Sequence, residues 1–586
     1  MGVSGFQKLQ AAEEVGGNEK VHIIEKICDW KIDHPEQQPI VVCRLKEVLM
    51  SVVQLNIKAA FFGGSHRFYH QQLDKFFQPL LDMNVKLVFF GGGQKTKEKL
   101  EKLLPKMDHN YMKYNSLMAF YDKHKIMKTC ARPELRTCLG LYEEGIARKY
   151  GEFILVTGSL NKTIVEYCRG NENVVAVLAK DSDFTIYDLK HVEYWGCGIE
   201  ELNFKNMTTF SFSRAALLAH LKLTPHQFHV LVAIVATILD DVQTNWLWLK
   251  KGVLPVKSLG SINIIRGVTA CVRKNVPAVE EKPRFGDWTK MIFHSHHERY
   301  CWMIEKQFKK YELSEDKPAA EDDKNTTNIL KKYKGIWSIV NDDVLRIDYI
   351  FQDLDRWNDD RNAMSLQNLF VMVLKRAMGI VLHSKRDDET LKRRFLMRGH
   401  HNERFKVLPK TLIFSSLDVP PIEKLIDEQT DADEEFITMK WTLLFWILHL
   451  DFDDDVKLKI RTLPREIAPV VLTVLFLLWE RQITPLEGDS IIISENGILK
   501  EPTDTDCVMY ELPSKVDGRT LRVSHVYVFT RTIINRCLQI CGIDLFNVPV
   551  SFDGIHFHNL INEFVADTAA FENKKADIKG FQVGEF

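Results

Sequence analysis

Two aspartates, Asp181 and Asp183, follow an apolar run at 174–178, and their spacing suits metal chemistry. Two carboxylates at i and i+2 beside a strand end can share a divalent cation, and Mg²⁺ prefers carboxylate oxygens. A capped turn, in which each Asp accepts local N–H bonds, explains the same spacing and is the commoner use of such a pair. The pair therefore indicates a metal site only if further carboxylates converge on it.

Two other segments have residue types that could bind a ligand. The sequence GGGQKT at 91–96 ends an apolar run, but its spacing does not match the G-x-x-x-x-G-K-[ST] of a phosphate-binding loop. We interpret it as a tight turn that uses the conformational freedom of glycine. The histidines at 294, 296 and 297 have no partner at a zinc-ligand spacing, which favours a solvated helix face.

The segment 375–410 carries eleven basic and four acidic side chains, a net charge of +7. Such a patch can contact several phosphates, and Phe395 and Phe405 are candidates for stacking on unpaired bases. A solvated charged loop explains the same composition equally well. The candidate nucleic-acid-binding residues are Lys375, Arg376, Lys385, Arg386, Lys392, Arg393, Arg394, Arg398, Arg404 and Lys406.

The elements that would position these residues alternate along the first half of the chain. Short apolar runs at 40–42, 85–90, 153–156 and 174–178 are candidate buried strands, and apolar residues spaced by three and four between 69 and 80 predict a helix. Strand, helix and strand in this order predict an α/β domain with a mostly parallel sheet. The working site of such a sheet lies at the carboxyl ends of its strands.

The second half of the sequence has a different pattern of apolar and charged residues. A charged stretch at 314–325 predicts a linker, and the helical spacing of apolar residues after it predicts a mainly helical region, with an irregular part at 487–526. We therefore predict an α/β domain at 1–310, a charged linker at 311–327 and a mainly helical domain at 328–586. The most apolar run, 467–479, is shorter than the roughly 20 residues of a membrane span and predicts a buried helix.

Composition sets outer limits on function. With 45% hydrophobic and 27% charged residues in 586, the chain is neither disordered nor fibrous. Its net charge of -1 means that any nucleic-acid contact must be a local patch. The 11 cysteines include no C-x-x-C pair, which favours a reduced compartment. The start of the chain has no signal-peptide pattern, so we expect an intracellular protein, nuclear or cytoplasmic, with no membrane partner.

Several motifs occur in an order that resembles a known superfamily. The chain opens with MGVSGFQ, continues with FFGG at 61–64 and VFFGGG at 88–93, and has KDSDFTIYD at 180–188. This order resembles the XPG/flap-endonuclease superfamily, and most closely asteroid and the constitutive coactivator of PPAR-gamma family. FDGIHFH at 552–558 also resembles a short motif near the C-terminal end of such proteins. The resemblance implies a PIN-like fold over about 1–310.

The resemblance also implies where an active member would have acidic metal ligands. At the matching positions this chain has Cys43, Gly91, Asn161, Lys162 and Ile238, while Glu166, Asp240 and Asp241 lie nearby. Only Asp181 and Asp183 match, as remnants of the site. A two-metal phosphodiesterase must offset about four positive charges, which two aspartates cannot do, and Lys162 is expected to add a positive charge to the pocket.

From this we expect no enzyme activity and no cofactor. The function that the resemblance implies is that of an RNA- and/or protein-binding regulator, in post-transcriptional control or as a coactivator scaffold. A protein partner is expected, and RNA is a second candidate partner. The alternative is a residual nuclease that cleaves branched or single-stranded nucleic acid with Mg²⁺. A third hypothesis is a pure protein scaffold that binds no nucleic acid. The basic segment is the feature that distinguishes this hypothesis from that of an RNA- and/or protein-binding regulator.

Overall fold

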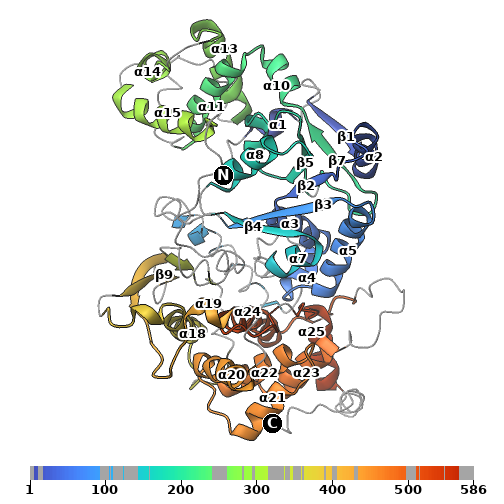
Figure 1. Cartoon of the computed structure of the whole chain (residues 1–586), viewed down its shortest axis with the longest axis vertical. Coiled ribbons are helices and arrows are strands. Elements are labelled where there is room, and N and C mark those ends of the chain that lie inside the picture. The colour runs from blue at the N-terminus through green and yellow to red at the C-terminus, as the bar shows by residue number, and fades with distance from the viewer. Residues whose placement is uncertain are drawn as a thin grey trace.

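The structure is a computed structural model of the chain, drawn as a ribbon in Figure 1. Its longer described stretches are 5–10, 17–92, 143–156, 159–198, 200–240, 261–279, 283–293, 297–313, 362–388, 391–398, 405–427, 433–496, 510–513, 515–546 and 548–566. Scattered positions between 104 and 124, and positions 336, 344–346, 358 and 360, are described as well. For a few of these residues, including Asp240, Arg398 and Phe405, only the backbone is described.

A seven-stranded sheet crosses the first half of the molecule, with strand order β1-β7-β6-β5-β2-β3-β4. The five strands from β6 to β4 run parallel to their neighbours, whereas β7 pairs antiparallel with β6 and with β1. The strands are β1 (Asn18–His22), β2 (Ile40–Cys43), β3 (Lys86–Gly92), β4 (Glu152–Val156), β5 (Val174–Ala179), β6 (Glu193–Gly196) and β7 (Thr208–Phe212). The predicted mostly parallel sheet is confirmed, and all four predicted strands lie in it.

The runs at 40–42 and 174–178 form the central strands β2 and β5 because both of their faces are covered. Every residue of β2 and of β5 is buried, as expected of parallel strands with helices on both sides. Side chains alternate between the faces, so Val41 and Cys43 enter one hydrophobic core while Ile40 and Val42 enter another. The sheet therefore separates two cores.

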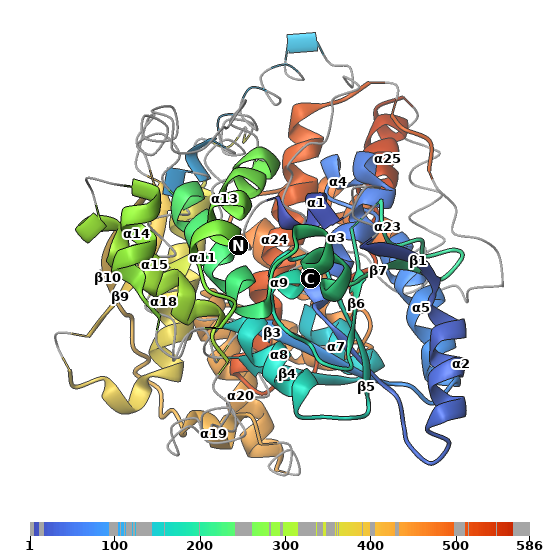
Figure 2. The same ribbon diagram turned by 90° about the horizontal axis from the view of Figure 1, so that it is seen from above.

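Helices cover both faces of this sheet. Those of the first half are α1 (Phe6–Gln10), α2 (Ile23–Asp33), α3 (Leu45–Leu55), α4 (Ile57–Phe61), α5 (His66–Asp82), α7 (Glu143–Tyr150), α8 (Leu160–Arg169), α9 (Asp183–Ile186), α10 (Arg214–Leu221), α11 (Pro225–Asp240), α13 (Ser261–Asn275), α14 (Phe285–Phe293) and α15 (His297–Tyr311). Helices α3, α5 and α7 face one core, and α8, α11 and α13 face the other. Figures 1 and 2 both place the group of α11, α13, α14 and α15 far from β1 and α2.

The described part of the second half is mainly helical, as predicted. Its helices are α18 (Leu366–Val381), the 3-10 turn η4 (His383–Lys385), α19 (Ile422–Leu425), α20 (Glu434–Leu448), α21 (Asp454–Arg461), α22 (Ala468–Trp479), α23 (Pro485–Asn496), α24 (Gly518–Ile540) and α25 (Gly554–Ala566). The prediction of an irregular segment at 487–526 is wrong where α23 and α24 lie. Their Gly and Thr residues are helical because tertiary packing buries these helices and overrides weak propensity.

The second half also contains a small sheet, and two of its strands lie in the basic segment. Three strands, β8 (Val344–Arg346), β9 (Lys392–Arg398) and β10 (Phe405–Thr411), form a second sheet in the order β10-β9-β8. Strands β9 and β10 pair antiparallel. In its described residues the basic segment comprises the end of α18, the exposed turn that contains η4, and the β9–β10 strand pair.

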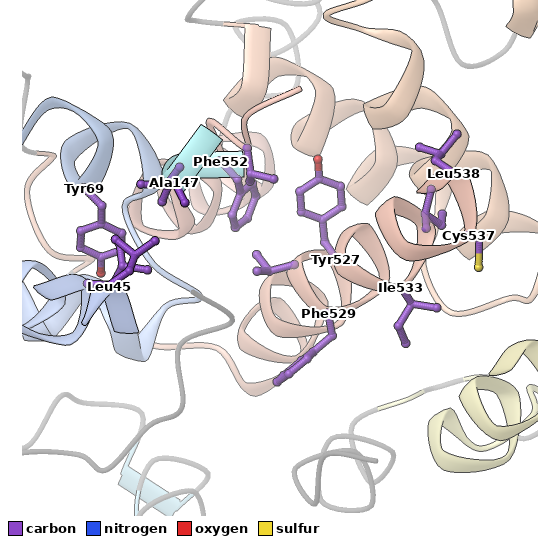
Figure 3. Close-up of a cluster of buried hydrophobic side chains, with 14 of the residues drawn as sticks. Leu45, Tyr69, Ala147, Tyr527, Phe529, Ile533, Cys537, Leu538 and Phe552 are labelled. Atoms are coloured by element: carbon purple, nitrogen blue, oxygen red, sulfur yellow. The ribbon is translucent and has the colours of Figure 1, made fainter. Parts of the chain in front are cut away.

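The two halves meet where α24 and α25 pack against the layer of α3, α4, α5 and α7 below the sheet (Figure 1). Phe552 and Tyr527 belong to the same hydrophobic core as Leu45 and Tyr69. In Figure 3, Phe552 lies between the first-half side chains and Tyr527. The predicted linker lies outside the described residues from 314 onward, and the domain boundaries stay a prediction.

Main-chain hydrogen bonds join the FFGG turn to the start of α25. The N–H of His66 donates to the carbonyl of Phe552 at 3.0 Å, and the N–H of Gly554 donates to the carbonyl of Gly64 at 2.9 Å. A β-carbon added at Gly554 would overlap the carbonyl oxygen of Phe62. This contact, which we call the junction, explains why a glycine is needed at 554: only a residue without a side chain lets the two backbones approach so closely.

Among the described residues no single helix is long and apolar enough to cross a membrane. One bent pair, Arg214–Leu221 with Pro225–Leu239, reaches that length and composition only when its two helices are taken together. The apolar run at 467–479 forms the short helix α22, whose residues from Ala468 to Leu477 are buried.

Candidate functional site

Asp181 and Asp183 lie at the carboxyl edge of the sheet, where the fold predicts a working site. Asp181 follows β5, and Asp183 is the first residue of α9. Arg44 follows β2, the parallel neighbour of β5, and its N–H donates to the carbonyl of Leu178 at 3.0 Å. Because the ends of adjacent parallel strands lie side by side, Arg44 reaches the aspartates although it is 137 residues away from Asp181.

Asp181 is paired with a cation of the chain itself. Arg44 Nη1 lies 2.7 Å from Asp181 Oδ2, and Asn161 Nδ2, on α8, donates to the same oxygen at 3.1 Å. The other oxygen, Oδ1, accepts the N–H of Asp183 at 3.2 Å. Both oxygens of Asp181 are thus engaged by donors of this chain.

Asp183 is bound by the end of α15 and by Asn161. Tyr311 Oη donates to Asp183 Oδ1 at 2.7 Å, and Asn161 Nδ2 donates to Oδ2 at 3.0 Å. Lys310 Nζ lies 3.7 Å from the same Oδ2. Asp183 is only 2% exposed, so these donors replace the water that would otherwise solvate its charge.

A third carboxylate belongs to the group, and sequence reasoning missed it. Glu47 on α3 lies 2.7 Å from Arg44 Nη1 and also accepts the N–H of Lys180. Arg44 and Glu47 are three residues apart at the start of α3, a spacing that brings side chains together. This spacing was the available signal, but nothing in it pointed to Asp181.

The pKa values at this edge follow from burial and from Arg44. Burial alone would raise the pKa of Asp181, but the guanidinium of Arg44 and the hydrogen bond from Asn161 outweigh it and hold this pKa below its usual value. Burial dominates at Glu47 and raises its pKa, although Arg44 opposes the rise. Burial, followed by the charge of Asp183, raises the pKa of Tyr311, which therefore remains a neutral donor.

These residues do not fit a two-metal centre. Such a centre needs several carboxylates with lone pairs directed at the ions, whereas each oxygen of Asp181 and Asp183 already accepts a hydrogen bond from the chain. In the described part of the chain, no three His, Cys, Asp or Glu residues are grouped so that they could hold a metal ion.

The other positions that the resemblance indicated lie apart from this cluster. Cys43 is fully buried, and its side chain enters the core on the α3 side of the sheet. A β-carbon at Gly91 would press against the ring of Phe153, and Ile238 is fully buried in α11. The side chain of Asp240, and the whole of Asp241, lie outside the described residues.

The expected role of Lys162 is not what the structure shows. Lys162 Nζ donates to the carbonyl of Glu312 at 3.0 Å on the surface, and not to either aspartate. The cations that face the aspartates are Arg44 and Lys310. Together with the bond from Tyr187 Oη to the carbonyl of Lys310 at 3.2 Å, the bond from Lys162 fixes the end of α15 over the site.

Two candidates from the basic segment have a structural role. Arg376 on α18 donates to the carbonyl of Trp446 at 2.7 Å, and its guanidinium lies 5.3 Å from the centre of that indole ring. Burial lowers the pKa of Arg376. Phe395 is fully buried, so the prediction that it stacks on bases is wrong. Phe405 is described only by its backbone.

The remaining basic candidates divide between two places. Lys385 and Arg386 lie in the exposed turn after α18, where Arg386 Nη1 is 3.2 Å from His383 Nε2. Lys392, Arg393, Arg394 and Lys406 lie on the β9–β10 strand pair, and Lys375 lies on α18 where its carbonyl accepts the N–H of Ile413, just after β10, at 3.4 Å. Arg398 is described only by its backbone, and Arg404 lies outside the described residues.

Comparison with known proteins gives distant likenesses among solved structures. No family model matches the chain, and no curated protein matches it. Among solved structures, the chain is similar to a protein of bacteriophage T5 co-crystallised with metal ions, at 12% identity and a TM-score of 0.23, over 47% of this chain and 98% of that one. It is also similar to a T5 flap endonuclease variant in a pseudo-enzyme–product complex with DNA and metal ions, at 10% identity, a TM-score of 0.23 and coverages of 46% and 100%. A third structure, a T5 5'-exonuclease with bound zinc, has 10% identity, a TM-score of 0.25 and coverages of 47% and 98%.

Proposed function

We propose that this chain is a catalytically inactive, PIN-like member of the XPG group that acts by binding RNA and/or protein. One observation carries the proposal: Arg44 Nη1 lies 2.7 Å from Asp181 and 2.7 Å from Glu47, between the carboxylates that a metal ion would need. The motif order of the sequence and the parallel sheet support the PIN-like assignment.

The guanidinium is a lasting occupant of this place. Arg stays protonated at every physiological pH, so Arg44 cannot leave the carboxylates by losing its charge. A divalent ion would have to displace it, together with the amide of Asn161 and the hydroxyl of Tyr311. Removing one partner of such a group leaves the others buried and unpaired, which is costly.

Binding, rather than cleavage, is then the activity that the surface supports. The β9–β10 strand pair carries Lys392, Arg393, Arg394, Lys406 and Lys410, and a basic surface of this kind attracts phosphates. A protein partner is the second candidate for the same regulatory role. The alternative of a residual nuclease requires Asp181 and Asp183 to exchange their present donors for metal ions.

The test measures metal binding and cleavage on the full chain. Melting temperatures in the presence and absence of Mn²⁺ or Mg²⁺ are expected to be equal, and flap and single-stranded substrates are expected to remain intact. Asp181→Asn is the matched variant, because it keeps the shape of the side chain and removes its charge. Metal-dependent cleavage that disappears in Asp181→Asn would overturn the proposal, whereas cleavage that persists in Asp181→Asn comes from a contaminant.

A further inference from the structure

Helix α15 is held in two different ways along its length. Its middle packs through apolar contacts, because Tyr300, Ile304 and Phe308 are buried. The ring of Phe308 stacks on that of His229 on α11, with 3.9 Å between the ring centres. Packing of this kind supplies most of the stability of a helix inside a protein. The end of the helix, residues 308–312, is held in addition by polar groups of other elements.

Side chains from three elements cap the carbonyl groups at this end. The last four carbonyls of an α-helix have no N–H partner within the helix, so donors from outside often satisfy them. Three donors do so here: His229 Nε2 to the carbonyl of Phe308 at 2.8 Å, Tyr187 Oη to that of Lys310 at 3.2 Å and Lys162 Nζ to that of Glu312 at 3.0 Å. They come from α11, from the residue after α9 and from α8. The end of α15 is therefore tied to the elements around the aspartates.

The remaining contact is buried and involves a charge. Tyr311 Oη donates to Asp183 Oδ1 at 2.7 Å and accepts a hydrogen bond from Lys310 Nζ at 2.8 Å. Asp183 is 2% exposed and Tyr311 is 5% exposed. A hydrogen bond to a charged acceptor stabilises more than a bond between neutral groups. The bond from Tyr311 to Asp183 should therefore contribute most to holding the end of α15 in place.

The two kinds of contact predict a local motion. The apolar packing of Tyr300, Ile304 and Phe308 does not involve Asp183, so the middle of α15 should stay in place without that bond. The end of the helix would lose its strongest polar contact and should open by itself. Local opening of this kind needs far less free energy than unfolding of the domain.

We propose that residues 308–312 form a strap that closes the aspartate site, and that Asp183 holds this strap through Tyr311. The inference rests on the proposed function, because an Asp183 that bound a metal ion would have to give up its bond to Tyr311. It assigns a present role to an acidic residue that the motif order relates to a metal site. Any cationic ligand of Asp183 must first open the strap.

The test measures amide hydrogen exchange of the full chain by mass spectrometry. The peptides compared cover the strap and, as a reference, strand β5. Tyr311→Phe removes the hydroxyl that binds Asp183 and keeps the ring. Tyr300→Phe is the matched control, because it removes a hydroxyl from a buried tyrosine in the middle of the same helix.

Exchange in the strap should become about 10- to 100-fold faster in Tyr311→Phe, the factor that corresponds to one lost hydrogen bond to a charged group. Exchange in β5 should stay as it is, and Tyr300→Phe should leave the strap unchanged. No change in the strap of Tyr311→Phe would show that Asp183 does not hold it. Equally faster exchange in the strap and in β5 would mean a general loss of stability, and would also overturn the inference.

A second pair of variants tests the carbonyl caps. Lys162→Met removes the donor to Glu312 and should make exchange in the strap about two- to tenfold faster. Lys309→Met removes a neighbouring lysine that pairs with Glu305 at 2.6 Å on the surface, and it should have at most about a twofold effect. Equal effects of the two substitutions would mean that the strap responds to surface charge and not to its caps.

The proposed function fails in a different experiment. Metal-dependent cleavage by the natural chain that is lost in Asp181→Asn contradicts the inactivity of the site, whatever the exchange of the strap. Unchanged exchange in Tyr311→Phe, without any cleavage, contradicts the strap alone.

Discussion

Asp181 at the sheet edge and Asp553 at the junction are both largely buried, but their pKa values shift in opposite directions. Burial pushes both pKa values upward. At Asp181 the cation of Arg44 reverses this effect, and the pKa falls below its usual value. Asp553 has only neutral donors, namely the hydroxyl of Ser65 and the N–H groups of Ile555 and His556, and its pKa stays raised.

The difference shows two ways to bury a carboxylate. At the sheet edge the negative charge of Asp181 is kept and is balanced by the guanidinium of Arg44. At the junction the carboxylate begins α25 and ties the FFGG turn to it through hydrogen bonds, so that geometry matters more than charge. Changes of shape should therefore harm the junction most, and changes of charge should harm the sheet edge most.

The largest expected effect is at the junction. Gly554→Ala would force a β-carbon against the carbonyl of Phe62 and break the bond from the Gly554 N–H to Gly64. Overpacking together with a lost hydrogen bond should lower the free energy of unfolding by up to about 4 kcal/mol. Urea unfolding measures it.

Gly145→Ala in α7 is the matched control for this change, because an added β-carbon there has no neighbour within 4 Å. Alanine in place of a helical glycine should stabilise the protein by about 0.5–1 kcal/mol. Equal effects of the two substitutions would contradict the close backbone contact at 554.

The next effect concerns charge at the sheet edge. Arg44→Met leaves Asp181 and Glu47 without their cation. The free energy of unfolding should fall by about 3 kcal/mol at neutral pH. This value is at the lower end of the range for a buried ion pair, because these side chains keep some exposure. Urea unfolding at several pH values measures it. Arg273→Met, at an exposed position of α13, is the matched control and should change stability by no more than about 0.5 kcal/mol.

The pH dependence sharpens this prediction. In the natural chain the lowered pKa of Asp181 contributes stability that is present at neutral pH and is lost as pH falls through that pKa. Without Arg44, burial raises the pKa of Asp181, so that its protonation relieves the buried charge. The deficit of Arg44→Met should then shrink as pH falls from 7 toward 4. A deficit that stays constant over this range would mean that lost packing, rather than charge, is responsible.

The smallest effect is a pH response of the junction. His525 Nε2 donates to the carbonyl of Phe61 at 2.9 Å, and burial lowers the pKa of His525 to about 4. The unfolded chain takes up this proton near pH 6.5 and the folded chain only near 4, so stability is lost between these values as pH falls. Between pH 6.5 and 5, the free energy of unfolding of His525→Gln should fall by about 2 kcal/mol less than that of the natural chain.

The control for this variant is His109→Gln, which changes an exposed histidine and should leave the pH profile as it is. His66 and His558 also have pKa values lowered to about 4, by burial first. The natural protein should therefore remain acid-sensitive after His525 alone is changed. A profile unaltered by His525→Gln would contradict a lowered pKa of His525, because it would mean that this pKa is the same in the folded and the unfolded chain.

Sequence patterns predicted much of the fold because they record burial directly. The apolar runs at 40–42 and 174–178 are buried on both faces, and such runs are typical of central parallel strands. The acidic pair was found for the same reason, since it follows one of these strands. The prediction failed for Phe395, because a phenylalanine in a basic segment can either stack on bases or pack in a core. Phe395 is paired in the β9–β10 strand pair and is buried in the core.

The sequence by itself determined the alternation of strands and helices, the position of Asp181 and Asp183 at a strand end, and the lack of further acidic residues at the matching positions. Only the tertiary structure decided which side chains bind the two aspartates. The side chains that bind the aspartates are far apart in the sequence: Arg44, Asn161 and Tyr311. No local sequence pattern links them to Asp181 or Asp183. They meet because parallel strands end at one edge and α15 closes over it, and contacts of that kind depend on packing between distant segments rather than on the spacing of neighbours.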